Sequence, residues 1–223
     1  MKRSGARSLD AYHILDIDGF RGVATLGRMT TTEPVTLKTR RWTRLEYERL
    51  IECGVLQEDE HVELLDGLLV VREPQGSRHN AGIRRVIAAL QSALGETWQI
   101  DSQLAIALDD DSEPEPDIAV VPRDPGSYRD AHPSHPVLIV EVAESSYRFD
   151  RTYKAGLYAR AGVPEYWIVD VARSVLEVHR QPGASSEAAH GWRYAIVETL
   201  RPPATVTPLI APAAPIRAAD LLP

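Results

Sequence analysis

The spacing of apolar residues changes several times along the chain, and each change predicts an element of secondary structure. Thr43, with Glu46 three residues later, is a capping-box pattern that predicts the start of a short helix ending at Gly54. The apolar runs VELL and LLVV follow, separated by an Asp-Gly dipeptide that favours a tight turn. We therefore expect a β-hairpin over residues 62–71.

Two further helices and a series of strands are predicted after this hairpin. An apolar stripe at helical spacing predicts a longer helix that begins after Ser77, its N-cap, and is ended by Gly95. Asp150 is a suitable N-cap for a second helix over residues 151–161. Short apolar runs predict strands over residues 98–108, 117–121, 137–143, 165–171, 175–180 and 192–198.

Helices interleaved with strands predict an α/β fold with a mixed sheet, because hairpins at both ends pair antiparallel strands. Residues 1–41 have no sustained period, so we expect a loosely ordered N-terminal extension there. Residues 42–200 should form the domain. Residues 201–223, rich in Pro and Ala, should pack on the same domain as a tail, with a short strand within 205–209 and a turn at 218–222.

Composition narrows the class of protein. The formal net charge of -7 argues against a protein that coats nucleic acid by bulk electrostatics, but it allows an enzyme with a local basic surface. Cys53 is the only cysteine, which excludes intramolecular disulfides and cysteine-rich zinc sites. No apolar run approaches the ~18 residues of a membrane span, and we expect a cytoplasmic protein. Met29 would also start the folded unit, so the status of residues 1–28 stays open.

Two carboxylates interrupt the predicted strands. Glu141 lies on the same strand face as Ile139 and Ala143, and Asp117 follows Pro116 at the start of a strand. A glutamate paired with an arginine, or an aspartate in a turn, would explain each residue separately. Together, two oxygen ligands from neighbouring strands and a backbone carbonyl form the partial shell that Mg²⁺ prefers, with water and phosphate completing it.

Lys154 lies one helical turn beyond Asp150. It could form a surface ion pair with Asp150, or it could reach back toward Glu141, where it would orient a water and stabilise charge on a phosphoryl group. A zinc hydrolase is another reading, because His132 and His135 are three residues apart. The prolines beside them predict a loop, however, rather than the helix that metal-binding HxxxH motifs use.

Several of these residues together carry a resemblance to a known family. The motif PD at 116–117, the EVA that begins at Glu141 and the run D-x-x-x-K-x-x-x-Y at 150–158 resemble the PD-(D/E)XK nuclease superfamily. More narrowly, the chain resembles the bacterial putative restriction endonuclease family of Uma-type proteins. The similarity extends to GVPEYWIVDV at 162–171, RHN at 78–80 and the segments WTRLEYERL and VELLDGLLV.

The resemblance implies a restriction-endonuclease-like core with flanking helices and additional β-hairpins. It also implies that Asp117 and Glu141 bind Mg²⁺ or Mn²⁺, with the carbonyl of Val142 as a third ligand. Glu63 matches an early acidic position of the family and would complete the catalytic site through a water, whereas its other reading is an exposed strand charge. The chain departs from the superfamily pattern at residue 143, where an alanine stands in place of the expected lysine. In this family the lysine is displaced to the helix, where Lys154 is its match.

The implied activity is metal-dependent cleavage of nucleic acid, and we expect DNA. Four residues could contact the substrate, and each could equally serve as a surface charge or a structural hydrogen-bonding group: Arg78, His79, Arg84 and Arg85. Homodimerisation fits this activity, because cutting both strands of a duplex commonly needs two sites, although no residue indicates an interface. The alternative is a catalytically inactive module that keeps the nuclease fold for binding or interaction.

Overall fold

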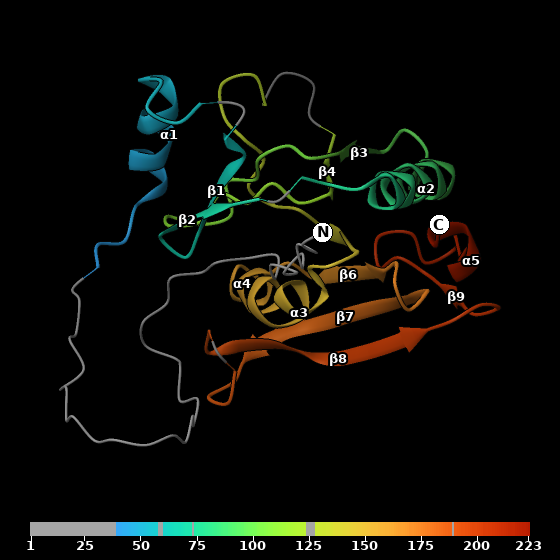
Figure 1. Ribbon diagram of the computed structural model, residues 1–223. Helices are drawn as coiled ribbons and strands as arrows, with labels where there is room; N and C mark the ends of the chain where they lie inside the picture. Colours follow the sequence, from blue (N-terminus) through green and yellow to red (C-terminus); the bar gives the residue numbers. More distant parts are fainter. Residues whose placement is uncertain (1–38, 58–59, 73, 124–127, 189) are drawn as a thin grey trace, which may run out of the picture.

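The computed structural model describes residues 39–57, 60–72, 74–123, 128–188 and 190–223. The extension predicted for residues 1–41 therefore lies almost entirely outside the described residues. The elements, in chain order (Figure 1), are α1 (Arg44–Glu52), β1 (Val62–Leu65), β2 (Leu68–Val71), α2 (Ser77–Leu94), β3 (Trp98–Asp101), β4 (Ile118–Pro122), β5 (Leu138–Ala143), α3 (Tyr147–Phe149), the π-helical turn η2 (Asp150–Lys154), α4 (Ala155–Arg160), β6 (Glu165–Asp170), β7 (Val175–Ala184), β8 (Trp192–Leu200), β9 (Thr205–Val206), β10 (Ile216–Arg217) and α5 (Ala218–Leu221).

A six-stranded mixed sheet forms the centre of the fold, in the order β3-β4-β5-β6-β7-β8. Strands β5 and β6 are parallel, and the segment α3–η2–α4 crosses over between them, whereas the other neighbours pair antiparallel. Two small hairpins, β1–β2 and β9–β10, lie outside this sheet. The α/β prediction with a mixed sheet and additional hairpins is confirmed.

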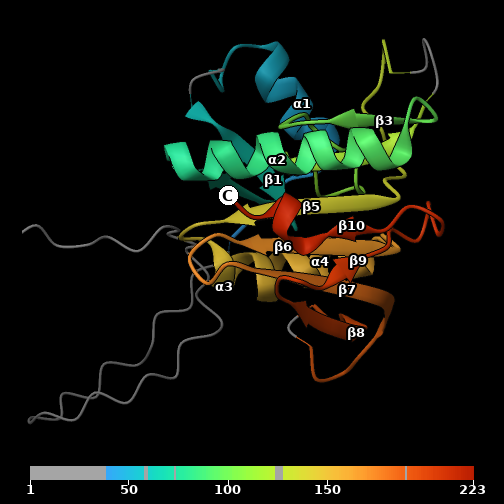
Figure 2. The same cartoon turned by 90° about the vertical axis from the view of Figure 1, so that its right-hand side faces the viewer.

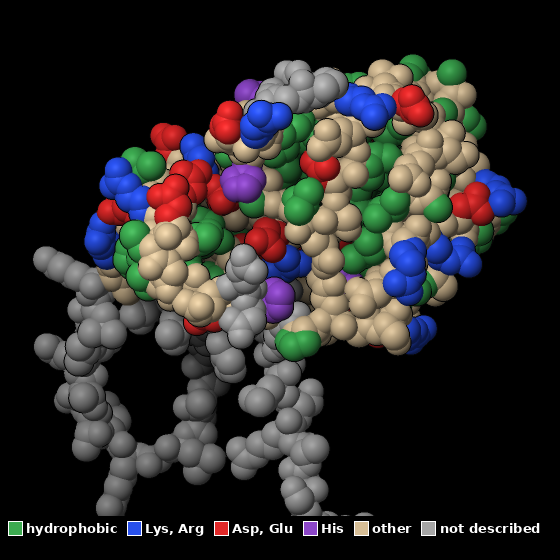
Figure 3. All heavy atoms as spheres, turned by 90° about the horizontal axis from the view of Figure 1, so that it is seen from above, with side chains coloured by type: hydrophobic (Ala, Val, Ile, Leu, Met, Phe, Trp, Pro, Cys, Tyr) green, Lys and Arg blue, Asp and Glu red, His purple; other side chains and the backbone are tan. Residues whose placement is uncertain are grey.

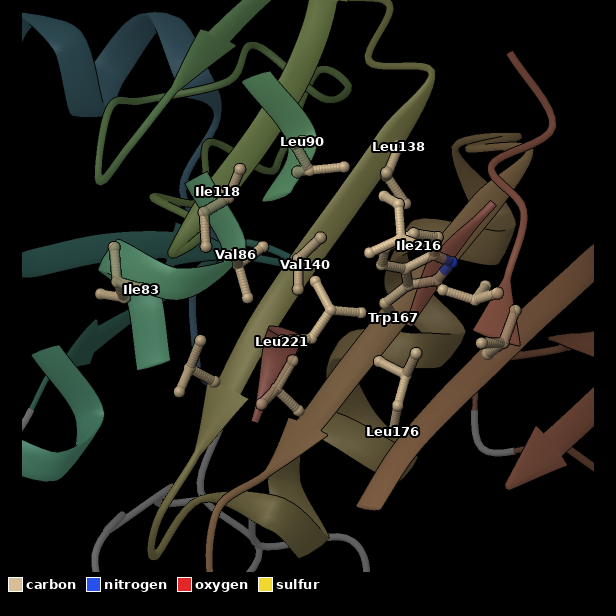
Figure 4. Close-up of a cluster of buried hydrophobic side chains, with 14 of the residues drawn as sticks. Ile83, Val86, Leu90, Ile118, Leu138, Val140, Trp167, Leu176, Ile216 and Leu221 are labelled. Atoms are coloured by element: carbon tan, nitrogen blue, oxygen red, sulfur yellow. The ribbon is translucent and has the colours of Figure 1, made fainter. Parts of the chain in front are cut away.

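Helices cover both faces of the sheet (Figure 2). On one face α2 packs with the C-terminal elements β10 and α5 over an apolar cluster that includes Val86, Leu90, Trp167 and Leu221 (Figure 4). On the other face α4 packs over a second apolar cluster, to which the β1–β2 hairpin also contributes. Among the residues described, no helix is long and apolar enough to cross a membrane.

Strand β5 is buried along its whole length and separates the two clusters. Leu138, Val140 and Val142 contribute to the α2 side, while Ile139 and Ala143 contribute to the α4 side, as the alternation predicts. Glu141 therefore points toward the α4 side with an apolar neighbour before and after it. A carboxylate in this position needs polar partners, because an uncompensated buried charge costs several kcal/mol.

Several predicted boundaries are wrong, and the strand predicted over 175–180, for example, runs to Ala184. Strand β3 ends at Asp101, and not at residue 108, because Gln103 has a φ of 54° and its N–H turns to the carbonyl of Pro116. Helix α2 begins at Ser77 itself, with Gly76 as an N-cap that offers no side-chain acceptor. Within the segment 218–222, where a turn was predicted, Ala218–Leu221 form a short helix.

A further difference concerns Asp150, which was expected to cap a helix that begins after it. The helical segment starts at Tyr147, three residues before Asp150, and Asp150 has helical φ and ψ angles of -62° and -41°. Its side chain accepts a hydrogen bond from the Ser146 hydroxyl at 2.5 Å instead of capping the helix. Asp150 is consequently a buried residue inside a helix, at the first position of the π-helical turn.

Candidate functional site

Asp117 and Glu141 face each other across two antiparallel strands. The register pairs Ile118 with Val140, which places the preceding Asp117 opposite Glu141. The backbone N–H of Asp117 points to Glu141 Oε2 at 3.4 Å, and both residues are only 4% exposed. The prediction that these carboxylates come from neighbouring strands is confirmed.

Helix α2 and the loop before it hold the Asp117 carboxylate from the side. His79 Nε2 lies 3.0 Å from Asp117 Oδ2, which also accepts the N–H of Val142 at 2.8 Å. Gln75 donates its amide to Asp117 Oδ1 at 3.3 Å. His79, proposed as a phosphate contact, therefore contacts the carboxylate directly, because its position in the first turn of α2 faces the sheet.

Lys154 reaches Glu141 from the helix, as expected. Its ammonium donates to Glu141 Oε1 at 3.0 Å, and the same oxygen accepts the Tyr158 hydroxyl at 2.7 Å. The π-helical turn ends at Lys154, and the side chain is 4% exposed, so the surface ion pair with Asp150 is not the arrangement found. Tyr158, the last residue of the motif at 150–158, is thus a buried donor to the same carboxylate.

Glu63 lies behind Lys154 and is fully buried. Its Oε1 is 3.4 Å from the Lys154 ammonium, and its Oε2 accepts the N–H of Glu115 at 3.0 Å. The reading of Glu63 as an exposed strand charge is therefore wrong. Lys154 lies between two carboxylates, Glu63 and Glu141, and this pairing offsets the cost of burying its charge.

A pocket of about 240 Å³ opens in front of these groups. Asp117, Glu141 and Lys154 line it, whereas Glu63 does not. Asp150 contributes a further buried carboxylate to the lining. The remaining lining residues are Arg72, Pro74, Gln75, Gly76, His79, Glu144, Ser145 and Ser146.

The carboxylates perturb one another's protonation. Burial raises the pKa of Glu141, and the charges of Asp117 and Glu63 add to the rise, while Lys154 opposes it. Burial and the charge of Glu141 raise the pKa of Asp150 well above its usual value. For His79, burial lowers the pKa, but the hydrogen bond and charge of Asp117 outweigh it, and the net change is upward. Part of the rise for Glu141 and for Asp150 comes from repulsion between neighbouring carboxylates, so a cation bound among them would favour their ionised forms.

Comparison with protein families identifies the chain. Residues 45–215 match the model of the family described as Uma2, putative restriction endonuclease. The chain belongs to this family. No curated protein matches it. Among solved structures, it is similar to a putative nuclease belonging to DUF820 from Anabaena variabilis ATCC 29413, with a TM-score of 0.57, 17% sequence identity, and coverage of 77% of this chain and 96% of that chain. This likeness supports the restriction-endonuclease-like fold.

The residues of this Uma2-family pocket fit a hard divalent cation, although the protein side chains alone would fill only part of its coordination shell. Within the described ranges, no three His, Cys, Asp or Glu side chains are grouped closely enough to hold a metal ion by themselves. Asp117 and Glu141 supply oxygen donors, which Mg²⁺ takes together with water or substrate phosphate. The excess of buried carboxylates favours the same ligand class. The Val142 carbonyl as a third ligand stays a prediction.

Of the residues expected to contact nucleic acid, His79 lines the pocket, whereas the three arginines do not. Arg78, Arg84 and Arg85 are exposed on α2, and Arg85 donates to the carbonyl of Ala219 at 3.2 Å. His132 also lies elsewhere, with Nε2 3.8 Å from Glu113 Oε1. On the face drawn in Figure 3, acidic and basic side chains are interspersed over most of the surface. The role of these arginines stays a prediction.

Sequence reasoning missed three polar residues of this Uma2-family site: Arg72, Gln75 and Asp150. Arg72 and Gln75 lie on the connection between β2 and α2, which has no periodic pattern. Arg72 bonds Glu115 Oε2 at 2.8 Å and lies 3.8 Å from Asp117 Oδ1. The only signal for Arg72 was its charge next to an apolar strand, because a charge that becomes buried there needs an acidic partner.

Proposed function

We propose that this protein is a metal-dependent endonuclease that hydrolyses phosphodiester bonds in nucleic acid, with DNA as the expected substrate. The observation that carries the proposal is the Lys154 ammonium 3.0 Å from Glu141 Oε1, beside Asp117 in one pocket. The family membership and the nuclease-like structural neighbour support the same reaction class. Asp117, Glu141 and Lys154 are the residues to which we assign it.

Each of these residues has a role that its surroundings support. Asp117 and Glu141 would hold Mg²⁺ or Mn²⁺ through their oxygens. The chemistry such an ion supplies is polarisation of the phosphate and a lower pKa for a bound water. Lys154 lines the pocket as a buried cation, where it can orient the attacking water and stabilise charge that develops on the phosphoryl oxygens. Glu63 holds the Lys154 ammonium in place from behind.

A cleavage assay on single- and double-stranded DNA and RNA tests the proposal. Wild-type protein should cut in Mg²⁺ or Mn²⁺, lose activity with a general chelator and keep it with a zinc-selective one. Glu141→Gln and Lys154→Met should each lower the rate by about 100-fold or more. Glu177→Gln, which alters a buried carboxylate on β7 outside the pocket, is the matched control and should stay active. Full activity in the Glu141 variant would refute the assignment.

A catalytically inactive binding module is the second candidate, and one observation favours it. Both Glu141 oxygens already have protein donors, namely Lys154, Tyr158 and the N–H of Asp117. A cation would have to displace or share these contacts. Nucleic-acid binding without cleavage in any metal would establish this candidate. Homodimerisation is a further proposal, and light scattering of the purified chain would test it.

A further inference from the structure

A second pocket adjoins the Asp117 pocket. Arg72, Pro74 and Gln75 line both. His61, Gln103 and Glu115 complete the second one, which measures about 340 Å³. We call it the flanking pocket. Its volume is within the range of roughly 300–1,000 Å³ that is usual for small-molecule sites. Because the two pockets share these three lining residues, a ligand too long for one pocket can extend into the other.

Hydrogen bonds connect the flanking pocket to the candidate metal ligand. Gln103 donates its amide to Gln75 Oε1 at 2.6 Å, and Gln75 in turn donates to Asp117 Oδ1 at 3.3 Å. Arg72 makes a parallel connection, since it bonds Glu115 and also approaches Asp117 Oδ1 at 3.8 Å. A group bound beside Gln103 is therefore connected to Asp117 through the side chains of Gln103 and Gln75.

The backbone is held in an unfavourable conformation at two positions of this pocket. His61 and Gln103 have φ angles of 47° and 54°, in the left-handed region that non-glycine residues rarely adopt. The Gln103 N–H bonds the carbonyls of Pro116 at 3.1 Å and Asp117 at 3.3 Å, which fixes it in this conformation. Residues constrained in this way concentrate at ligand-binding sites. Here the constraint directs two polar side chains into the same pocket.

The charges of the flanking pocket indicate an uncharged group rather than a phosphate. Its one guanidinium, on Arg72, is paired with Glu115, which also lines the pocket. The Gln75 and Gln103 amides both donate and accept hydrogen bonds, as the edge of a nucleobase requires. We propose that the flanking pocket binds the sugar–base unit next to the scissile phosphate, with the Gln103 amide contacting that unit. This inference rests on the proposed nuclease function.

Two substrates distinguish binding in the flanking pocket from an effect on phosphodiester hydrolysis itself. Bis(4-nitrophenyl) phosphate has no nucleoside, whereas a fluorescein-labelled oligonucleotide has one on each side of every phosphate. Gln103→Gly removes the side chain and keeps the left-handed backbone, because glycine adopts that conformation readily. Gln99→Ala, on β3 and outside both pockets, removes a comparable amide that bonds Asp101 at 2.8 Å. Oligonucleotide binding in Ca²⁺ is measured as well, so that affinity is recorded without turnover.

Gln103→Gly removes one proposed hydrogen bond to the sugar–base unit. We therefore expect the KM and the Kd for the oligonucleotide to rise about fivefold. Turnover of the small diester should stay within about twofold, and Gln99→Ala should match wild type on both substrates. Unchanged oligonucleotide KM and Kd would overturn the inference, as would an equal loss on both substrates. If wild type binds the oligonucleotide but cleaves neither substrate, the proposed function fails, and the Kd ratio alone then decides the flanking pocket.

Discussion

At the scale of single residues, the site depends on buried donors that hold charged groups in fixed positions. The Tyr158 hydroxyl and the Lys154 ammonium converge on one oxygen of Glu141. Burial raises the pKa of Tyr158 well above its ordinary value, so this hydroxyl stays protonated and remains a donor. Tyr158 is therefore a positioning residue for Glu141 in the proposed reaction.

Substituting Tyr158 by phenylalanine tests this role. The ring is retained, but Glu141 loses a donor, and we expect kcat/KM to fall about tenfold with a loss of about 1 kcal/mol in stability. Tyr194→Phe is the matched control, since Tyr194 is a buried tyrosine whose hydroxyl bonds the Val163 carbonyl at 2.9 Å. Cleavage kinetics and thermal unfolding of both variants are compared. Equal activity in the two variants would show that Tyr158 only packs.

The raised pKa of Glu113 leads to a predicted pH dependence of the protein's stability. Burial and the charge of Glu48 raise its pKa from 4.5 to about 7, while Arg44 opposes the rise. The folded state therefore holds this proton more tightly than the unfolded state, and stability falls as the pH increases from about 4.5 to 7. We expect Glu113→Gln to be more stable than wild type at pH 8, by on the order of 1–3 kcal/mol. Thermal unfolding should show the difference shrinking toward pH 4.5, and a pH-independent difference would contradict this account.

At the scale of elements, the close approach of α2 to β5 holds His79 beside Asp117. A Cβ added at Gly82 would lie 2.7 Å from Val142 Cγ1, and Val142 is the residue whose N–H bonds Asp117. Because Gly82 and Val142 are both buried, neither the added methyl group nor the Val142 side chain could move aside easily. The glycine allows the helix to lie against the strand that bears Glu141.

Gly82→Ala should therefore destabilise the protein, although alanine is the better helix former by about 1 kcal/mol. Overpacking typically costs about 1–3 kcal/mol, and we expect a net loss together with reduced cleavage, since α2 would move away from Asp117. Ser92→Ala, at an exposed position of the same helix, is the control and should be neutral or slightly stabilising. Chemical denaturation measures both variants. A stabilised Gly82 variant would mean that β5 and α2 can separate at little cost.

The sequence predicted the elements of this domain better than their ends. The alternation along β5 and the apolar stripe of α2 could be predicted, because the spacing of apolar residues in the sequence directly reflects which positions are buried. The start of the helical segment at Tyr147 did not follow, because Asp150 is equally suited to an N-cap and to a buried hydrogen bond with Ser146. The pairing of Glu141 with Lys154 was predicted through the family resemblance, whereas the contributions of Arg72 and Gln75 depend on tertiary contacts that no local pattern contains.

At the scale of the whole molecule, the net charge is negative, and acidic and basic side chains both occur on the face drawn in Figure 3. The chain carries a net charge of -7, and the face in Figure 3 shows acids among the basic residues, with a group of Lys and Arg side chains at one end. The field of such a surface attracts a polyanion only locally. Nucleic acid bound at the pocket would therefore meet few basic side chains.

This distribution predicts a weak salt dependence of nucleic-acid binding. If about two to four phosphates are neutralised, the slope of log K against log salt should be about -2 to -4. Fluorescence anisotropy of a labelled duplex in Ca²⁺, over a range of NaCl concentrations, measures it. A slope steeper than about -6 would require a basic surface larger than the one described.

The connection from β5 to β6 has a consequence for how the site assembles. Glu141 and Lys154 are separated by 13 residues, whereas His79 and Asp117 are separated by 38. The first pair can form within one strand–helix unit, and the second needs α2 to dock on the sheet. Native-state hydrogen exchange should then distinguish two cooperative units. Fluctuations that release α2 would break the contact between His79 and Asp117 while leaving the lysine–glutamate pair protected, so that the pocket loses its function in stages rather than all at once.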